Sequence, residues 1–115
     1  MSEEYSFKDI KVIDLVSMNF IELISELEKR PSILPERTIL CLDALIHGWL
    51  IGRGYEADNG IMNRFNVFIE KQYGVTTTHG WARIIHHYST DGYDGLQKFF
   101  ELFNQFLKTD SKNET

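Results

Sequence analysis

The chain has 115 residues, of which 43% are hydrophobic and 25% are charged. This is the composition of one globular domain, and it excludes both an intrinsically disordered chain and a chain with separate catalytic and regulatory domains. The net charge is −5 and no basic stripe is present, so nucleic acid is not an expected partner, because phosphates are bound by clustered lysine and arginine.

The N-terminus and the cysteine content predict a cytoplasmic protein. The first residues are acidic and no apolar run follows them, unlike a secretion signal. The longest apolar stretch, residues 44–51, contains His47 and Gly48 and is too short to span a bilayer. Cys41 is the only cysteine, so no intramolecular disulfide can form. We therefore expect no membrane partner.

The apolar spacing predicts an all-α fold, a single-domain bundle of about five helices. We expect an N-terminal arm at residues 1–16, a helical domain at 17–108 and a disordered tail at 109–115. Apolar residues alternate partly between Tyr5 and Leu15, which leaves a short strand or an irregular arm open. The first helix is expected to begin at Ser17 or Asn19 and to end before Pro31, because proline disfavours helical geometry in the residue before it.

The second helix is expected to run from about residue 37 or 38 to Gly54. One face carries a continuous apolar stripe, while an adjoining face carries small residues four positions apart, namely Ala44, Gly48 and Gly52. Small side chains let another helix come close, so this spacing predicts a close helix contact at that face.

Three further helices follow along the chain. A third helix is expected to end at Gly74 as a left-handed C-cap, and a threonine among residues 76–78 is expected to cap the fourth. The fourth helix has apolar residues Trp81, Ile84, Ile85 and Tyr88 at helical spacing. A fifth helix, with Asp91 as its candidate cap, carries a dense aromatic stripe that is expected to form the core, namely Phe99, Phe100, Phe103 and Phe106.

The sequence predicts no catalytic residue, no cofactor and no metal site. His86 and His87 are neighbours, so on a helix they point about 100° apart and cannot easily share one ion. His79 lies two turns before His86, and no Cys-x-x-Cys or carboxylate pair completes a site. A cleft that gathers His79, Arg83, His86 or His87 would instead indicate a small enzyme or a ligand-binding domain.

An exposed aromatic residue among acids predicts a surface for a protein partner. Tyr93 lies between Asp91 and Asp94 at the expected start of the fifth helix, and such clusters occur at interfaces. Glu22 and Glu26 form a second acidic pair, in a first third of the chain (residues 1–36) that holds eight acids and four bases. Such a surface suits a basic partner.

The order of cap and core residues resembles a family of small, uncharacterised bacterial all-helical proteins. The resemblance covers residues 20–108 and rests on these elements: Arg30-Pro31, the Thr38-Ile39 helix start, Gly48-Trp49, Lys71-Gln72-Tyr73-Gly74, Trp81 with Ile84-Ile85, and the Phe99-to-Leu107 finish. Some members look like immunity proteins of polymorphic or contact-dependent toxin systems, which are cytosolic inhibitors of a cognate toxin. The resemblance implies a shared fold and a protein partner.

From these observations we expect a non-enzymatic protein-binding domain. The most concrete form is a toxin-neutralising immunity protein whose acidic residues Asp91, Asp94, Glu22 and Glu26, with Tyr93, occlude a basic toxin domain. Two alternatives stay open. One is the enzyme or ligand-binding domain that uses the histidines, and the other is a homo-oligomeric module, such as a homodimer, that associates through the glycine-bearing helix.

Overall fold

The computed structural model describes residues 14, 15, 17–76 and 79–113, and the side chains only as far as residue 110. Within these ranges the chain is an all-α bundle without strands, which confirms the predicted fold class. The five helices are α1 (Phe20–Lys29), α2 (Ile39–Arg53), α3 (Ile61–Tyr73), α4 (Trp81–His87) and α5 (Gly92–Asn113). Two 3₁₀ turns are η2 (Pro31–Ile33) and η3 (Tyr55–Asp58). Most of the arm expected at residues 1–16, including nearly all of the candidate strand, lies outside the described residues.

Local sequence sets the ends of the first three helices. At the start of α1 the side chain of Asn19 accepts a hydrogen bond from the Glu22 amide at 2.8 Å, and Glu22 accepts one from the Asn19 amide at 3.0 Å. This reciprocal capping box satisfies two amides that a helix leaves unpaired. Thr38 caps α2 through its hydroxyl, and Gly74 ends α3 with a φ of +67°. The predicted caps Asn19 and Gly74 are confirmed, and the second helix begins where it was expected.

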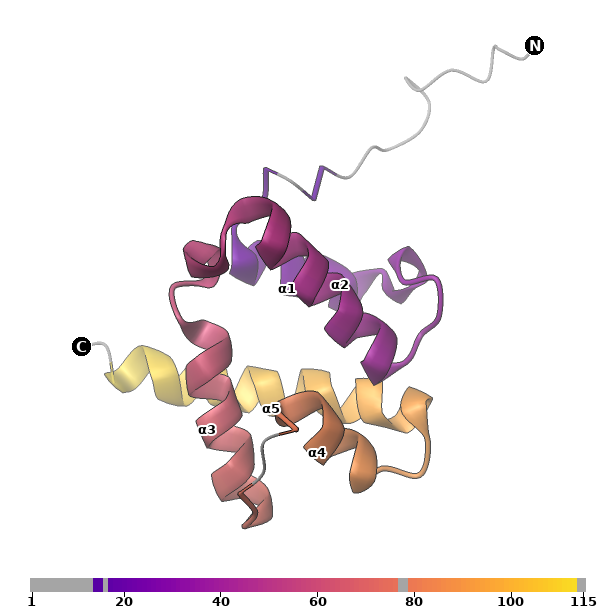
Figure 1. The fold of residues 1–115 in the computed structure, drawn as a ribbon, viewed down its shortest axis with the longest axis vertical. Coiled ribbons are helices and arrows are strands. Elements are labelled where there is room, and N and C mark those ends of the chain that lie inside the picture. The colour runs from indigo at the N-terminus through magenta and orange to yellow at the C-terminus, as the bar shows by residue number, and fades with distance from the viewer. Residues whose placement is uncertain (1–13, 16, 77–78, 114–115) are drawn as a thin grey trace.

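The helices pack around the long α5. Figure 1 shows α5 running across the molecule, with α1 and α2 on one side of it, α4 on the other, and α3 crossing it. Helix α2 packs against both α4 and α5, and α3 packs against the same two helices. None of the described helices combines the length and hydrophobicity that crossing a membrane requires.

The core is an aromatic cluster around Phe65 of α3. The Phe65 ring lies 5.6 Å from Trp81 of α4 and 5.3 Å from Phe103 of α5, both at steep edge-to-face angles. Such geometry suits the charge distribution of aromatic rings. Phe99, Phe100 and Phe106 are also buried, so the aromatic stripe of α5 is core as predicted.

Among the described residues, no other helix contacts the glycine-bearing face of α2. Ala44, Gly48 and Gly52 are exposed, and a Cβ at either glycine would meet no atom within 4 Å. The close approach occurs elsewhere, where Gly92 and Gly95 of α5 press against Thr38 and Ile39. The predicted contact was therefore assigned to the wrong glycines, because spacing alone does not say which face a neighbour covers.

Two other predictions about helix ends were wrong. The N-cap residue of helix α4 is Gly80, whose φ is +90°, and not a threonine from 76–78, of which Thr77 and Thr78 lie outside the described residues; no described side chain caps this helix. Helix α5 continues to Asn113, whereas disorder was expected from Thr109. Asp110 explains the extension, since its buried carboxylate pairs with Arg64 of α3.

Candidate functional site

The four residues of the ligand-binding alternative line one groove beside α4. Trp81, Ile84 and Ile85 turn one face of this helix into the core, which leaves Arg83 and His87 exposed and His86 half-buried. The groove has a volume of about 670 Å³, within the range of small-molecule sites. Its lining residues are Val75, His79, Arg83, Ile84, His86, His87 and Tyr88.

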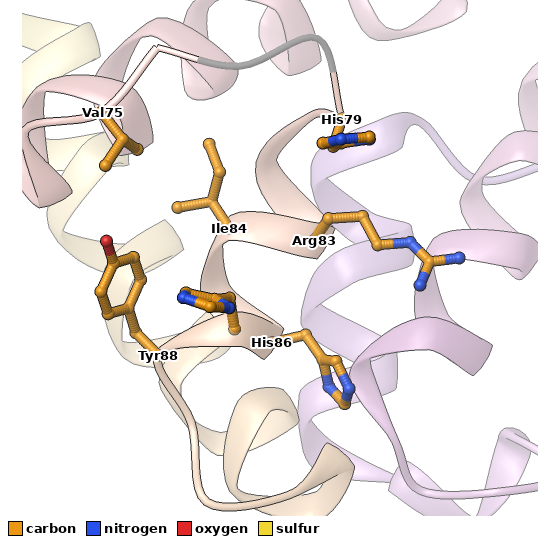
Figure 2. Close-up of a pocket in the computed structure, with 7 residues that line it drawn as sticks. Val75, His79, Arg83, Ile84, His86 and Tyr88 are labelled. Carbon is orange, nitrogen blue, oxygen red and sulfur yellow. The ribbon is translucent and has the colours of Figure 1, made fainter.

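The groove has two chemically different ends. Figure 2 shows Val75, Ile84 and Tyr88 toward one end, and His79 above Arg83 toward the other. The Arg83 guanidinium points away from Tyr88. One end is therefore apolar and aromatic, and the other carries nitrogen donors.

His86 contributes a buried nitrogen without a partner. Its Nδ1 atom is shielded from solvent and has no hydrogen-bond partner among the described residues. A buried polar atom left unpaired costs free energy, and in native proteins such atoms are few. His86 also lines the groove, so the unpaired nitrogen belongs to a residue that a ligand there would touch.

Asp43 of α2 lies within electrostatic range of Arg83. Burial raises the pKa of the Asp43 carboxyl, and the positive charges of His47 and Arg83 act in the opposite direction. The Asp43 carboxylate lies 3.2 Å from His47 Nδ1, one turn along α2. The acidic neighbour of Arg83 is therefore Asp43, whose carboxylate already pairs with His47. Arg83 remains available to an anion in the groove.

The aromatic end is a stack of rings from two helix ends. The Tyr88 ring lies 4.9 Å from that of Tyr73, at an interplanar angle of 15°, and His87 meets Tyr88 at 4.8 Å and 89°. Lys98 of α5 holds the Tyr88 backbone in place, since its ammonium donates a hydrogen bond to the Tyr88 carbonyl oxygen at 2.9 Å. Burial is also the main cause of the raised pKa of the Tyr73 hydroxyl.

Tyr88 corrects one sequence-based assignment. Its spacing from Trp81 and Ile85 placed it on the apolar stripe of α4, yet it is 47% exposed. It is the C-cap residue, where the helix ends, so it no longer follows the buried face. The sequence signal for the groove was the set of four polar residues, whereas nothing in the sequence indicated Val75, Tyr88 or Asp43.

The acids beside Tyr93 hold the start of α5 together. Asp91 accepts a hydrogen bond from the Asp94 amide at 2.8 Å, so it is the predicted cap. Asp94 accepts one from the Thr90 amide at 2.9 Å and forms an ion pair with Lys98 at 3.3 Å. The Thr90 hydrogen bond, followed by Lys98, lowers the pKa of the Asp94 carboxyl.

The other predicted acids also have local partners. Glu22 is half of the capping box of α1, and Glu26 lies 3.5 Å from Arg30 one turn later. Tyr93 is 59% exposed and lines a second groove, of about 430 Å³, between α1, η2 and α5. That groove contains Glu28 and Glu101 but none of the four predicted acids.

Among the described residues, no three His, Cys, Asp or Glu side chains lie close enough together to hold one metal ion. Comparison of the chain with known protein families, with curated proteins and with solved structures finds no match.

Proposed function

We propose that this chain is a non-enzymatic binding domain that holds a small organic anion in the groove beside α4. The observation that supports the proposal is the gathering of Arg83 and three imidazoles in one concave site. A cleft with converging polar groups is what distinguishes a ligand-binding domain from a filled bundle.

The chemistry of the lining favours an anion. Arg83 carries a permanent charge and five N–H donors, which match the oxygens of a carboxylate or phosphate. His79, His86 and His87 add ring nitrogens that donate when protonated. Arg83 places a permanent positive charge in this groove on a chain whose net charge is −5, so electrostatics would direct an anion to this face rather than to the acidic parts of the surface.

The first test is a titration with benzoate and phenyl phosphate, followed by isothermal calorimetry and by NMR of the α4 amides and imidazoles. We expect binding that Arg83→Gln weakens about tenfold or more, the usual cost of losing a charge-assisted hydrogen bond. Arg37→Gln is the matched control, because Arg37 is an exposed arginine that lines the other groove. Equal loss in both variants, or no binding at all, would reject the proposal.

A protein partner is a second candidate function, and Tyr93 is the observation that favours it. Exposed tyrosines are enriched at interfaces, and this one lines a groove with Glu28 and Glu101. The occupant would be a basic protein surface, as in the immunity-protein hypothesis. Asp91, Asp94 and Glu22 hold helix starts, so reversing their charge would also destabilise the fold. Tyr93→Ser is therefore the better probe of the interface.

This second candidate is tested by mixing the chain with basic toxin domains and measuring affinity. We expect Tyr93→Ser to weaken the complex at least tenfold while the unfolding midpoint stays within a few degrees of the parent. If Tyr93→Ser and Glu28→Lys both leave affinity unchanged, the second groove is not the interface. Light scattering on the same samples tests the homodimer alternative.

A further inference from the structure

We infer that the anion bound beside α4 is attached to a flat aromatic ring, as in an aryl phosphate or an aryl carboxylate. This inference rests on the proposed function and narrows it from organic anions in general to one ligand class. It is carried by the two ends of the groove, which differ in chemistry and lie within one cavity.

The aromatic end offers a ring surface rather than only apolar bulk. Tyr88 stacks nearly parallel on Tyr73, and His87 meets it edge to face. Even with these two contacts, Tyr88 remains 47% exposed. An added planar ring would extend an existing aromatic cluster, in the offset or edge-to-face geometry that aromatic pairs prefer.

The apolar side chains around this end suit the ring's hydrophobic body. Val75, just after the end of α3, lines this end of the groove, and the side chain of Ile84 extends from α4 beside it. Neither side chain offers a hydrogen bond to a sugar hydroxyl or to an amide. A polar, non-aromatic anion would gain no hydrophobic contact with these two side chains.

The nitrogen-rich end then fixes the direction of the ligand. His79 and Arg83 lie at the end of the groove away from Tyr88. A ring with one anionic substituent would therefore lie with the ring against Tyr88 and the substituent toward Arg83. The cavity of about 670 Å³ has room for such a molecule.

The test compares phenyl phosphate with cyclohexyl phosphate, which have six ring carbons and the same anionic group but differ in planarity. We expect phenyl phosphate to bind about 3- to 10-fold more tightly, the contribution of one aromatic pair. Tyr88→Leu should abolish that preference, whereas Tyr88→Phe should retain it. Tyr93→Leu, which removes an exposed tyrosine of the other groove, should leave it unchanged.

Each outcome separates the two proposals. If phenyl phosphate binds no more tightly than cyclohexyl phosphate or inorganic phosphate, the aromatic inference is overturned and the anion site still stands. Binding of neither phosphate nor of benzoate overturns both. A preference for phenyl phosphate that Tyr88→Leu does not change places the ring elsewhere and also overturns the inference. Because Tyr88 is about half exposed at a helix end, the leucine variant is expected to fold.

Discussion

Gly95 of α5 lies directly against Ile39, the first residue of α2. A Cβ at position 95 would sit 2.9 Å from Cγ2 of Ile39, closer than real side chains pack. Ile39 is fully buried, so it has little room to move away. This contact sets how closely α5 approaches the start of α2, and through α2 and α4 it helps to position the groove.

Gly95→Ala is therefore expected to destabilise the fold by about 1–2 kcal/mol, since overpacking a core outweighs the gain in helix propensity. Gly48→Ala is the matched control, because Gly48 is also helical but a Cβ there meets nothing within 4 Å. We expect it to stabilise the fold by up to about 1 kcal/mol. Urea unfolding measures both. Stabilisation by both substitutions would show that α5 can shift away from Ile39.

Asp94 should make stability depend on pH in the acid range. Its folded-state pKa lies below the ordinary 3.8, mainly because it accepts the Thr90 amide and also pairs with Lys98. The ionised form therefore favours the folded state, and this contribution is present above pH 3.8 and lost as the pH falls through the lowered pKa.

The corresponding experiment is the urea midpoint of the parent and of Asp94→Ala between pH 6 and pH 2.5. We expect the variant to be less stable at pH 6, and the difference to shrink as the pH falls below 3.8. A difference that stays constant over this range would mean that the carboxylate charge contributes nothing at this helix start.

The ion pair between Arg64 and Asp110 should hold the last turns of α5. Arg64 donates through Nε to Oδ1 at 2.9 Å and through Nη2 to Oδ2 at 3.1 Å, the bidentate geometry that makes such pairs strong. The arginine is partly exposed, so we expect Asp110→Asn to cost only about 1 kcal/mol.

Hydrogen exchange gives the local readout for that variant. Amides of residues 106–110 should exchange faster in Asp110→Asn, while those of α1 should be unaffected. The matched control is Asn104→Ala, which removes a longer contact to Glu28 at 3.3 Å from the exposed face of the same helix. If amides 106–110 exchange as slowly in Asp110→Asn as in Asn104→Ala, the helix end is stable without the ion pair.

Replacing His86 by Gln should weaken the binding of benzenesulfonate in the groove without abolishing it, because one imidazole of the lining is lost while Arg83 keeps its charge. Calorimetry measures the affinity of the parent and of the variant. His47→Gln controls for an indirect effect, because His47 partners Asp43 and does not line the groove. An affinity that is unchanged in His86→Gln would mean that this imidazole does not face the bound anion.

The sequence determined most of the helices and their ends. Asn19 with Glu22, Thr38, Gly74 and Asp91 act within one helical turn of their own positions, so local rules identify them. The aromatic stripe of α5 was also readable, because its period follows from helix geometry alone.

Only the tertiary structure decided which surfaces are covered and which side chains meet. Gly48 and Gly95 look alike in the sequence, yet one faces solvent and the other touches Ile39. His86 and Arg83 were candidates by type, but the apolar end supplied by Val75 and Tyr88 depends on how α3 packs on α4. Contacts between residues distant in the chain depend on the packing of all the helices together, and no local pattern encodes that arrangement.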